Sequence, residues 1–263
     1  MKHLPTLVVG VVSYILFLVS ALYALSFTLG GILPVPISIP HAPAALALLV
    51  DVGLLLTFGI QHSVMARSGW KKRWIIIIPP AMERSLYVLI ASGILLALFW
   101  CWQPISDVIW QINGTPIRAV VYGVCLAGWA IVVLSTFQID HFELFGLRQM
   151  WQTLRDQPPR PIAFKRPFLY RIVRHPMMAG FLLVFWATPT MTVDRLVLAL
   201  GMTIYILVGI SFEERALRRQ FGVTYEKYQT EVPQLIPLPR KHHSVIGTAL
   251  RDTSSGSATT ARR

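Results

Sequence analysis

The fold of this chain is decided by residues 170–222, YRIVRHPMMAGFLLVFWATPTMTVDRLVLALGMTIYILVGISFEERALRRQFG, in which charged residues flank two apolar runs. The runs cover about 176–188 and 195–212, and between them Pro189 and Asp194 indicate a turn. This pattern predicts an antiparallel helical hairpin whose two charged ends lie at the same membrane surface. The first run is shorter than the roughly 20 apolar residues that cross a bilayer, so both a full and a partial crossing fit it.

The rest of the chain has the composition of an integral membrane protein. Of its 263 residues, 54% are hydrophobic and 14% are charged, whereas soluble domains carry about 25% charged residues. Four further stretches are long and apolar enough to cross a bilayer, at about 6–30, 44–65, 84–102 and 117–138. We therefore predict an all-α, polytopic transmembrane bundle of about six segments, with five crossings as the alternative.

The formal net charge of +12 is distributed unevenly along the chain. Lys and Arg gather in three regions, at 67–73, 148–174 and 215–241. In contrast, the loop at 31–43 has none and the loop at 103–118 has only Arg118. Six crossings would place every basic region and both termini in the cytoplasm, as the positive-inside rule requires. This explanation of the charge makes nucleic-acid binding unnecessary.

The sequence predicts one membrane domain, residues 1–247, followed by a disordered tail at 248–263 that is polar and poor in apolar residues. Cys101 and Cys125 have no CxxC or His-rich spacing around them, so they indicate neither a disulfide framework nor a metal site. The oligomeric state is not predicted.

Candidate binding groups lie at both ends of the hairpin. Arg174 and His175 precede Pro176, which suits the first turn of a helix, and the free amides there favour a carboxylate or phosphate. Glu213 and Glu214 close the second run, where an acidic group near the apolar zone needs a partner. That partner is either a nearby arginine, such as Arg174, or a cationic or hydroxyl-bearing ligand.

RHPMMAGF, followed by an apolar run and EERALRRQFGVTYEKYQTEVPQLIP, resembles the integral membrane methyltransferases that include isoprenylcysteine carboxyl methyltransferase and phospholipid methyltransferases. The resemblance implies that S-adenosylmethionine binds to the C-terminal part, about 139–237. It places the following residues at the cofactor site, to which we add Gln149 and Tyr170: Arg174, His175, Pro176, Gly180, Glu213 and Glu214. Met178 stands where many members have tyrosine.

Other blocks narrow the resemblance. QHSVMARSGWKKRW at 61–74 and IDHFELFGLRQ at 139–149 are similar to the methanethiol S-methyltransferase family, and NnrU-like proteins share part of the N-terminal pattern. This implies a small thiol substrate, dimethyl sulfide as product and a bacterial inner-membrane location. Thiol specificity is then expected near His62 and in the block that begins at Ser135.

Methyl transfer to a thiol needs alignment of the reacting atoms and a group that removes a proton. His62, Asp140 and His141 are candidates because all lie near the expected cytoplasmic ends of their segments, with Arg84 as a supporting residue. Each has a structural alternative: Asp140 and His141 point about 100° apart on a helix, and Arg84 can pair with Glu83 or Asp140.

Two other functions remain open from the sequence. The same architecture could methylate a lipid or a lipidated cysteine, which would need a lateral opening between helices. A haem-binding membrane protein could use His62 and His141 as axial ligands, although this leaves the charged hairpin ends unexplained.

Overall fold

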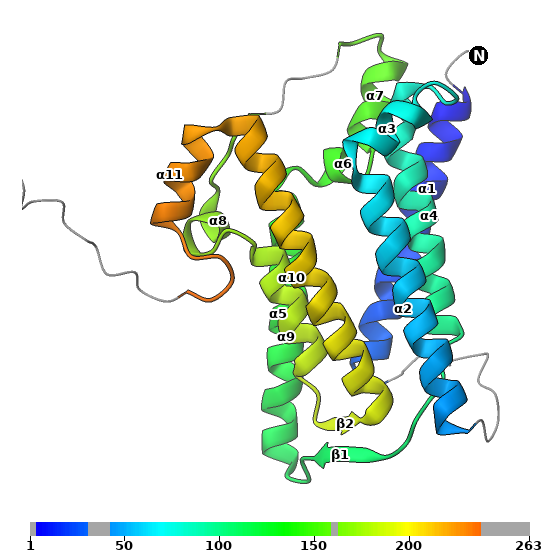
Figure 1. Cartoon of the computed structure of the whole chain (residues 1–263), viewed down its shortest axis with the longest axis vertical. Coiled ribbons are helices and arrows are strands. Elements are labelled where there is room, and N and C mark those ends of the chain that lie inside the picture. The colour runs from blue at the N-terminus through cyan, green and yellow to red at the C-terminus, as the bar shows by residue number, and fades with distance from the viewer. Residues whose placement is uncertain (1–3, 31–42, 159–162, 238–263) are drawn as a thin grey trace, which may run out of the picture.

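The computed structural model describes residues 4–30, 43–158 and 163–237. The predicted tail at 248–263 and both chain termini lie outside the described residues. Five helices are long and apolar enough to cross a membrane, namely α1 (Leu4–Thr28), α2 (Ala44–Ala66), α4 (Pro80–Trp100), α5 (Thr115–Ile139) and α10 (Val193–Phe221). The all-α membrane bundle is therefore confirmed (Figure 1).

Shorter elements complete the described part of the chain. They are α3 (Ser68–Trp74), α6 (His141–Leu144), α7 (Leu147–Leu154), α8 (Phe168–Ile172), α9 (Pro176–Trp186) and α11 (Val223–Glu231). Strands β1 (Val108–Gln111) and β2 (Thr190–Thr192) pair antiparallel and join two loops at one end of the bundle. Sequence reasoning predicted only a turn before α10, because a strand of three residues gives too little alternation to be recognised.

The predicted hairpin forms, with a short first arm. Helix α9 has 11 residues and spans about 16 Å, which is half of a bilayer core. His175, just before α9, nevertheless contacts Glu213 and Glu214 near the C-terminal end of α10. The chain between the two helices, which includes β2, therefore makes up the difference in length between α9 and α10. The hairpin thus brings its charged ends together although only its second arm is a full-length helix.

The helices form two units. The N-terminal unit packs α1 and α2 against α4, and the C-terminal unit packs α9 and α10 together with α5. Near the β-strand end one apolar core joins both units, with buried residues from α1, α2, α4 and α10. Toward the other end the upper parts of α2 and α10 separate (Figure 1), and each unit has its own core. Arg67, just after α2, still lies 4.6 Å above the ring of Phe212 on α10.

Close packing of two glycines fixes α9 on α5. A Cβ atom added to Gly180 would lie 2.7 Å from the carbonyl oxygen of Gly128, and one added to Gly128 would lie 2.8 Å from that of Gly180. Real Cβ atoms do not approach backbone this closely, so both positions exclude larger residues. Gly180 therefore has a packing role, and its predicted contact with a cofactor stays a prediction.

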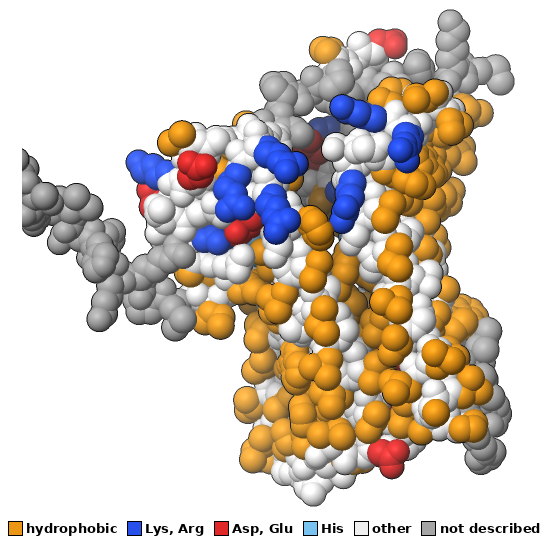
Figure 2. All heavy atoms as spheres, in the orientation of Figure 1, with side chains coloured by type: hydrophobic (Ala, Val, Ile, Leu, Met, Phe, Trp, Pro, Cys, Tyr) orange, Lys and Arg blue, Asp and Glu red, His pale blue; other side chains and the backbone are white. Residues whose placement is uncertain are grey.

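The surface of the bundle also differs between its two ends. On the face in Figure 2, Lys and Arg side chains gather around the end where the units separate, while hydrophobic side chains cover the lower bundle. The basic residues come from α3 and from the last turns of α10, namely Lys71, Lys72, Arg73, Arg215, Arg218 and Arg219. We call this the basic end of the bundle.

Candidate functional site

A buried ion pair forms the first part of the candidate site. Arg174 follows α8, and its Nε and Nη2 lie 2.8 Å and 2.6 Å from Oε1 of Glu214 on α10. Both side chains are buried, with 7% and 10% of their side-chain surface exposed. Separating two buried charges would leave each of them uncompensated, at a high cost in free energy. The ion pair therefore holds the start of α9 against α10.

The C-terminal segment completes this charged corner. Arg174 Nη1 donates to the carbonyl oxygens of Gln229 and Val232, at 3.1 Å and 2.6 Å, and Gln229 Nε2 donates to Glu214 Oε2 at 2.9 Å. The backbone amides of Arg174 and His175 donate to the carbonyl oxygens of Pro233 and Gln234. The chain after α11 therefore wraps over the RHP sequence and is part of the site.

Two tyrosines hold that segment in place. Tyr228 on α11 donates its hydroxyl to the carbonyl oxygen of Tyr170, at 2.5 Å. Burial raises the pKa of Tyr228 to about 12, against the opposing effect of the Arg166 and Arg174 guanidinium groups. The hydroxyl hence remains a donor at neutral pH. Tyr170, a predicted cofactor residue, serves here through its backbone, and burial also raises the pKa of its own hydroxyl.

His175 links both acidic residues. Its Nε2 lies 3.2 Å from Glu214 Oε1, and its Nδ1 lies 3.5 Å from Glu213 Oε2. Unlike Glu214, Glu213 keeps 47% of its side-chain surface exposed. The structure therefore pairs the positive and negative groups with each other and leaves Glu213 as the accessible carboxylate of the corner.

Asp140 and His141 have separate partners, but not through a 100° offset on one helix, because Asp140 lies between α5 and α6 with an extended backbone. Asp140 forms an ion pair with Arg148 and accepts a hydrogen bond from the backbone N–H of Glu143, at 3.1 Å. It thus caps α6 and anchors the segment before α7.

Both ring nitrogens of His141 have partners. Nε2 lies 2.9 Å from Tyr14 Oη and Nδ1 lies 2.9 Å from Thr136 Oγ1. Burial lowers the pKa of His141, although the neighbouring Asp140 carboxylate acts in the opposite direction. A neutral imidazole with both nitrogens occupied is poorly suited to act as an axial haem ligand, which weakens the haem alternative.

His62 has a different environment on α2. Its Nε2 lies 2.8 Å from Tyr87 Oη on α4, whereas its Nδ1 is buried and has no hydrogen-bond partner among the described residues. The rings of Phe58, Tyr87 and Tyr205 surround it, with centroids 5.3, 5.1 and 6.1 Å from the imidazole. We call these four side chains the His62 cage.

Arg84 lies beside the cage, and Gln149 is bonded within the α6–α7 segment. Arg84 donates from Nε to the carbonyl oxygen of Leu144 at 2.7 Å, and its guanidinium lies 5.1 Å from the Tyr87 ring centroid. Gln149 Nε2 donates to the carbonyl oxygen of Glu143, at 3.3 Å, while its Oε1 is buried and has no partner within the described chain. Arg84 therefore ties α4 to the α6 region, and the free amide oxygen keeps Gln149 a candidate ligand contact.

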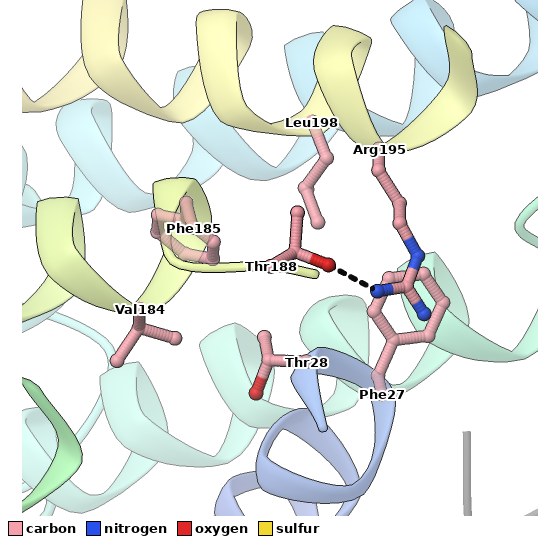
Figure 3. A pocket seen from close by; sticks show the side chains of 7 residues that line it. All are labelled: Phe27, Thr28, Val184, Phe185, Thr188, Arg195 and Leu198. Atoms are coloured by element: carbon pink, nitrogen blue, oxygen red, sulfur yellow. Dashed lines mark hydrogen bonds between the residues drawn. The ribbon is translucent and has the colours of Figure 1, made fainter. Parts of the chain in front are cut away.

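A small pocket lies at the opposite end of the bundle (Figure 3). It is lined by Phe27, Thr28, Val184, Phe185, Thr188, Arg195 and Leu198. Arg195 Nη1 donates to Thr188 Oγ1 at 3.0 Å within it. These residues come from the end of α1, the end of α9, the loop that follows α9 and the start of α10, so the pocket is separate from the charged corner.

Sequence reasoning missed the residues that join distant segments. Gln229 and Val232 close the charged corner, and Tyr205 completes the His62 cage. The tyrosine-rich stretch after α10 was a signal for the first two. For Tyr205 the only signal was an isolated polar aromatic residue in an apolar helix, which is more often simple packing.

Comparison with known proteins places these features in a family. The family model described as NnrU protein matches residues 50–249. Methanethiol S-methyltransferase of Mycobacterium tuberculosis is 46% identical over 245 residues, which cover 92% of this chain and 100% of that protein. Methanethiol S-methyltransferase 2 of Bradyrhizobium diazoefficiens is 48% identical over 237 residues, covering 89% and 91%.

A more distant relative is nurim of Sus scrofa, 32% identical over 180 residues that cover 64% of this chain and 67% of that protein. No solved structure matches the chain. The match of the family model extends from within α2 to beyond α11, so it includes both the His62 cage and the charged corner. The chain belongs to the NnrU family.

Proposed function

We propose that this protein transfers a methyl group from S-adenosylmethionine to methanethiol and releases dimethyl sulfide. The observation that carries the proposal is 46–48% identity to two methanethiol S-methyltransferases over about nine tenths of this chain. The N-terminal unit, where thiol specificity is expected, is included in that similarity.

The charged corner is proposed as the binding site for the methyl donor. S-adenosylmethionine carries an ammonium group and ribose hydroxyls, and the exposed Glu213 carboxylate beside His175 offers an acceptor for either. The carboxylate of S-adenosylmethionine suits the first turn of α9, because the first backbone amides of a helix lack intrahelical acceptors. The donor set of the corner therefore fits a zwitterion of this kind.

Arg174 takes a positioning role in this proposal. At least four of its five N–H groups point to Glu214 and to the carbonyl oxygens of Gln229 and Val232. A guanidinium bonded in this way holds α9, α10 and the C-terminal segment in register and has little capacity left for a ligand carboxylate.

The bound donor supplies an electrophilic methyl group next to a good leaving group. The protein then has three tasks, which are to align the thiol sulfur with that carbon, to exclude water and to accept a proton. The charged corner lies on the C-terminal unit, whereas three of the four side chains of the His62 cage come from α2 and α4 and the fourth, Tyr205, comes from α10, so a donor held at the corner can face a thiol held by the cage.

We also propose a bacterial inner membrane as the location, with both termini in the cytoplasm. The basic end carries Lys71, Lys72 and Arg73 from one unit and Arg215, Arg218 and Arg219 from the other. Positive side chains at one end of a membrane bundle favour the cytoplasmic side.

The direct test supplies purified protein with S-adenosylmethionine and methanethiol and measures dimethyl sulfide in the headspace. Product above a boiled control is expected. If the protein binds the donor and forms no product, the thiol substrate is wrong, and a lipid or lipidated substrate should be tested with the same labelled donor.

A further inference from the structure

We propose that the His62 cage is the thiol subsite, in which Phe58, Tyr87 and Tyr205 enclose the alkyl group and Nδ1 of His62 accepts the thiol proton. This inference rests on the proposed function and assigns its substrate to particular side chains.

The position of the cage favours this role. Phe58 and His62 are one helical turn apart on α2 and present one face, Tyr87 comes from α4, and Tyr205 comes from α10 of the other unit. Phe58 belongs to the core that joins the two units, whereas Tyr87 belongs to the core of the N-terminal unit alone. The cage thus lies where the core that joins the units meets the core of the N-terminal unit, and the His62 ring is half-buried there.

Nδ1 is the ring nitrogen of His62 that has no hydrogen-bond partner among the described residues. Tyr87 Oη lies 2.8 Å from Nε2 of His62 and 3.5 Å from the carbonyl oxygen of the same residue. When the Tyr87 hydroxyl proton points to that carbonyl, the Nε2–H group donates to Tyr87 Oη, and Nδ1 carries a lone pair. A buried acceptor that lacks a donor costs free energy, and an incoming S–H group would supply the donor.

The chemistry of the walls suits a small, uncharged thiol. Sulfur makes favourable contacts with aromatic rings, and three aromatic rings have centroids 5.1–6.1 Å from the centroid of the imidazole, so a thiol bonded to Nδ1 would have aromatic neighbours. Phe58 and Tyr205 also contact each other, with ring centroids 5.8 Å apart. The four side chains of the cage carry no fixed positive charge, and the nearby Arg84 guanidinium, 5.1 Å from the Tyr87 ring centroid, donates from Nε to the carbonyl oxygen of Leu144.

The reaction needs only the thiol, the sulfonium donor and His62. The thiol sulfur attacks the methyl carbon of the sulfonium donor, a new carbon–sulfur bond forms, and the bond from that carbon to the donor sulfur breaks. Its electron pair stays on the donor sulfur, which becomes a neutral thioether. The thiol proton moves to Nδ1 of His62 and is later released to water.

Substrate size tests the walls of the cage. Product formation by wild type, Tyr205→Phe and Tyr205→Ala is measured with methanethiol, ethanethiol and 1-propanethiol. Tyr205→Ala should shift the kcat/KM ratio toward the longer thiols by about tenfold or more, the usual effect of one methylene in an apolar pocket. Tyr205→Phe keeps the ring and should keep the preference, and Tyr122→Ala on α5 is the matched control.

His62→Ala tests the proton acceptor. Its kcat should fall by about 10²- to 10⁴-fold, and the loss should shrink toward alkaline pH, where the thiol ionises without a base. The affinity for S-adenosylmethionine, measured by calorimetry on each variant, should stay within twofold of wild type and also shows that the variant is folded.

The outcomes separate the inference from the proposed function. An active wild type whose thiol preference survives Tyr205→Ala, or whose kcat survives His62→Ala, overturns the cage as the thiol subsite. A wild type that binds the donor and methylates none of the three thiols instead overturns the proposed function.

Discussion

The charged corner and the His62 cage solve opposite problems with buried polar groups. In the corner, Arg174 and Glu214 satisfy each other and are bonded further by Gln229 and two carbonyl groups. In the cage, Nδ1 of His62 is buried without a partner among the described residues, and the surrounding groups are aromatic. The difference indicates that the corner is a preformed scaffold, whereas the cage gains its missing interaction when a ligand arrives.

The largest effect should come from breaking the scaffold. Glu214→Ala leaves the buried Arg174 charge uncompensated, so we expect a loss of about 3–5 kcal/mol in the free energy of unfolding and much weaker binding of S-adenosylmethionine. Thermal unfolding in detergent and calorimetry measure the two effects.

Glu231→Ala is the matched control for that substitution. Its carboxylate pairs with Arg166 at 2.7 Å, but both side chains are more than a third exposed, so the loss should stay below about 1 kcal/mol. Equal shifts for the two variants would show that the buried pair does not organise the corner.

A smaller effect is expected from forcing α9 away from α5. Gly128→Ala places a methyl group against the Gly180 carbonyl, and overpacking of this kind costs about 1–3 kcal/mol. Because α9 carries His175, donor affinity should fall as well. Gly123→Ala, on the same helix with nothing within 4 Å of its added Cβ, should leave thermal stability and donor affinity almost unchanged. If Gly123→Ala is equally harmful, helix packing is not the cause.

Two substitutions of Asp140 test whether its role is structural. Asp140→Ala removes the cap of α6 and the partner of Arg148, at a cost of about 1 kcal/mol. Asp140→Asn can still cap the helix and should be closer to wild type in thermal unfolding. A fall of more than about 100-fold in turnover for the Asn variant, with stability retained, would instead identify Asp140 as the general base.

The smallest effect should be a pH dependence from His141. Burial lowers the pKa of its imidazole in the folded protein below the ordinary value of 6.5. At a pH between the folded pKa and 6.5, the unfolded chain therefore binds the proton more readily than the folded protein does. Its contribution to stability is complete above pH 6.5 and is lost as the pH falls toward the folded pKa.

His141→Gln should reduce the difference in thermal unfolding temperature between pH 7.5 and pH 5.5. An unchanged difference would assign the acid sensitivity to other groups.

The sequence determined the elements of this fold because the signals are local. An apolar stretch of about 20 residues has few stable states other than a membrane helix, and proline with charged neighbours indicates where the hairpin begins. The family could also be assigned from residues that are close in sequence, such as RHPMMAGF and IDHFELFGLRQ, and this assignment is confirmed.

The tertiary structure decided which groups meet. Arg174 reaches Glu214 across 40 residues and Val232 across 58 residues, and Tyr205 meets His62 only because α10 turns this face toward α2. Charge patterns left open whether the hairpin ends bind a ligand or each other, since spacing gives the face of a helix and not what lies opposite. The rotation and contact of packed helices settle that choice, as the close approach of Gly128 and Gly180 does for α5 and α9.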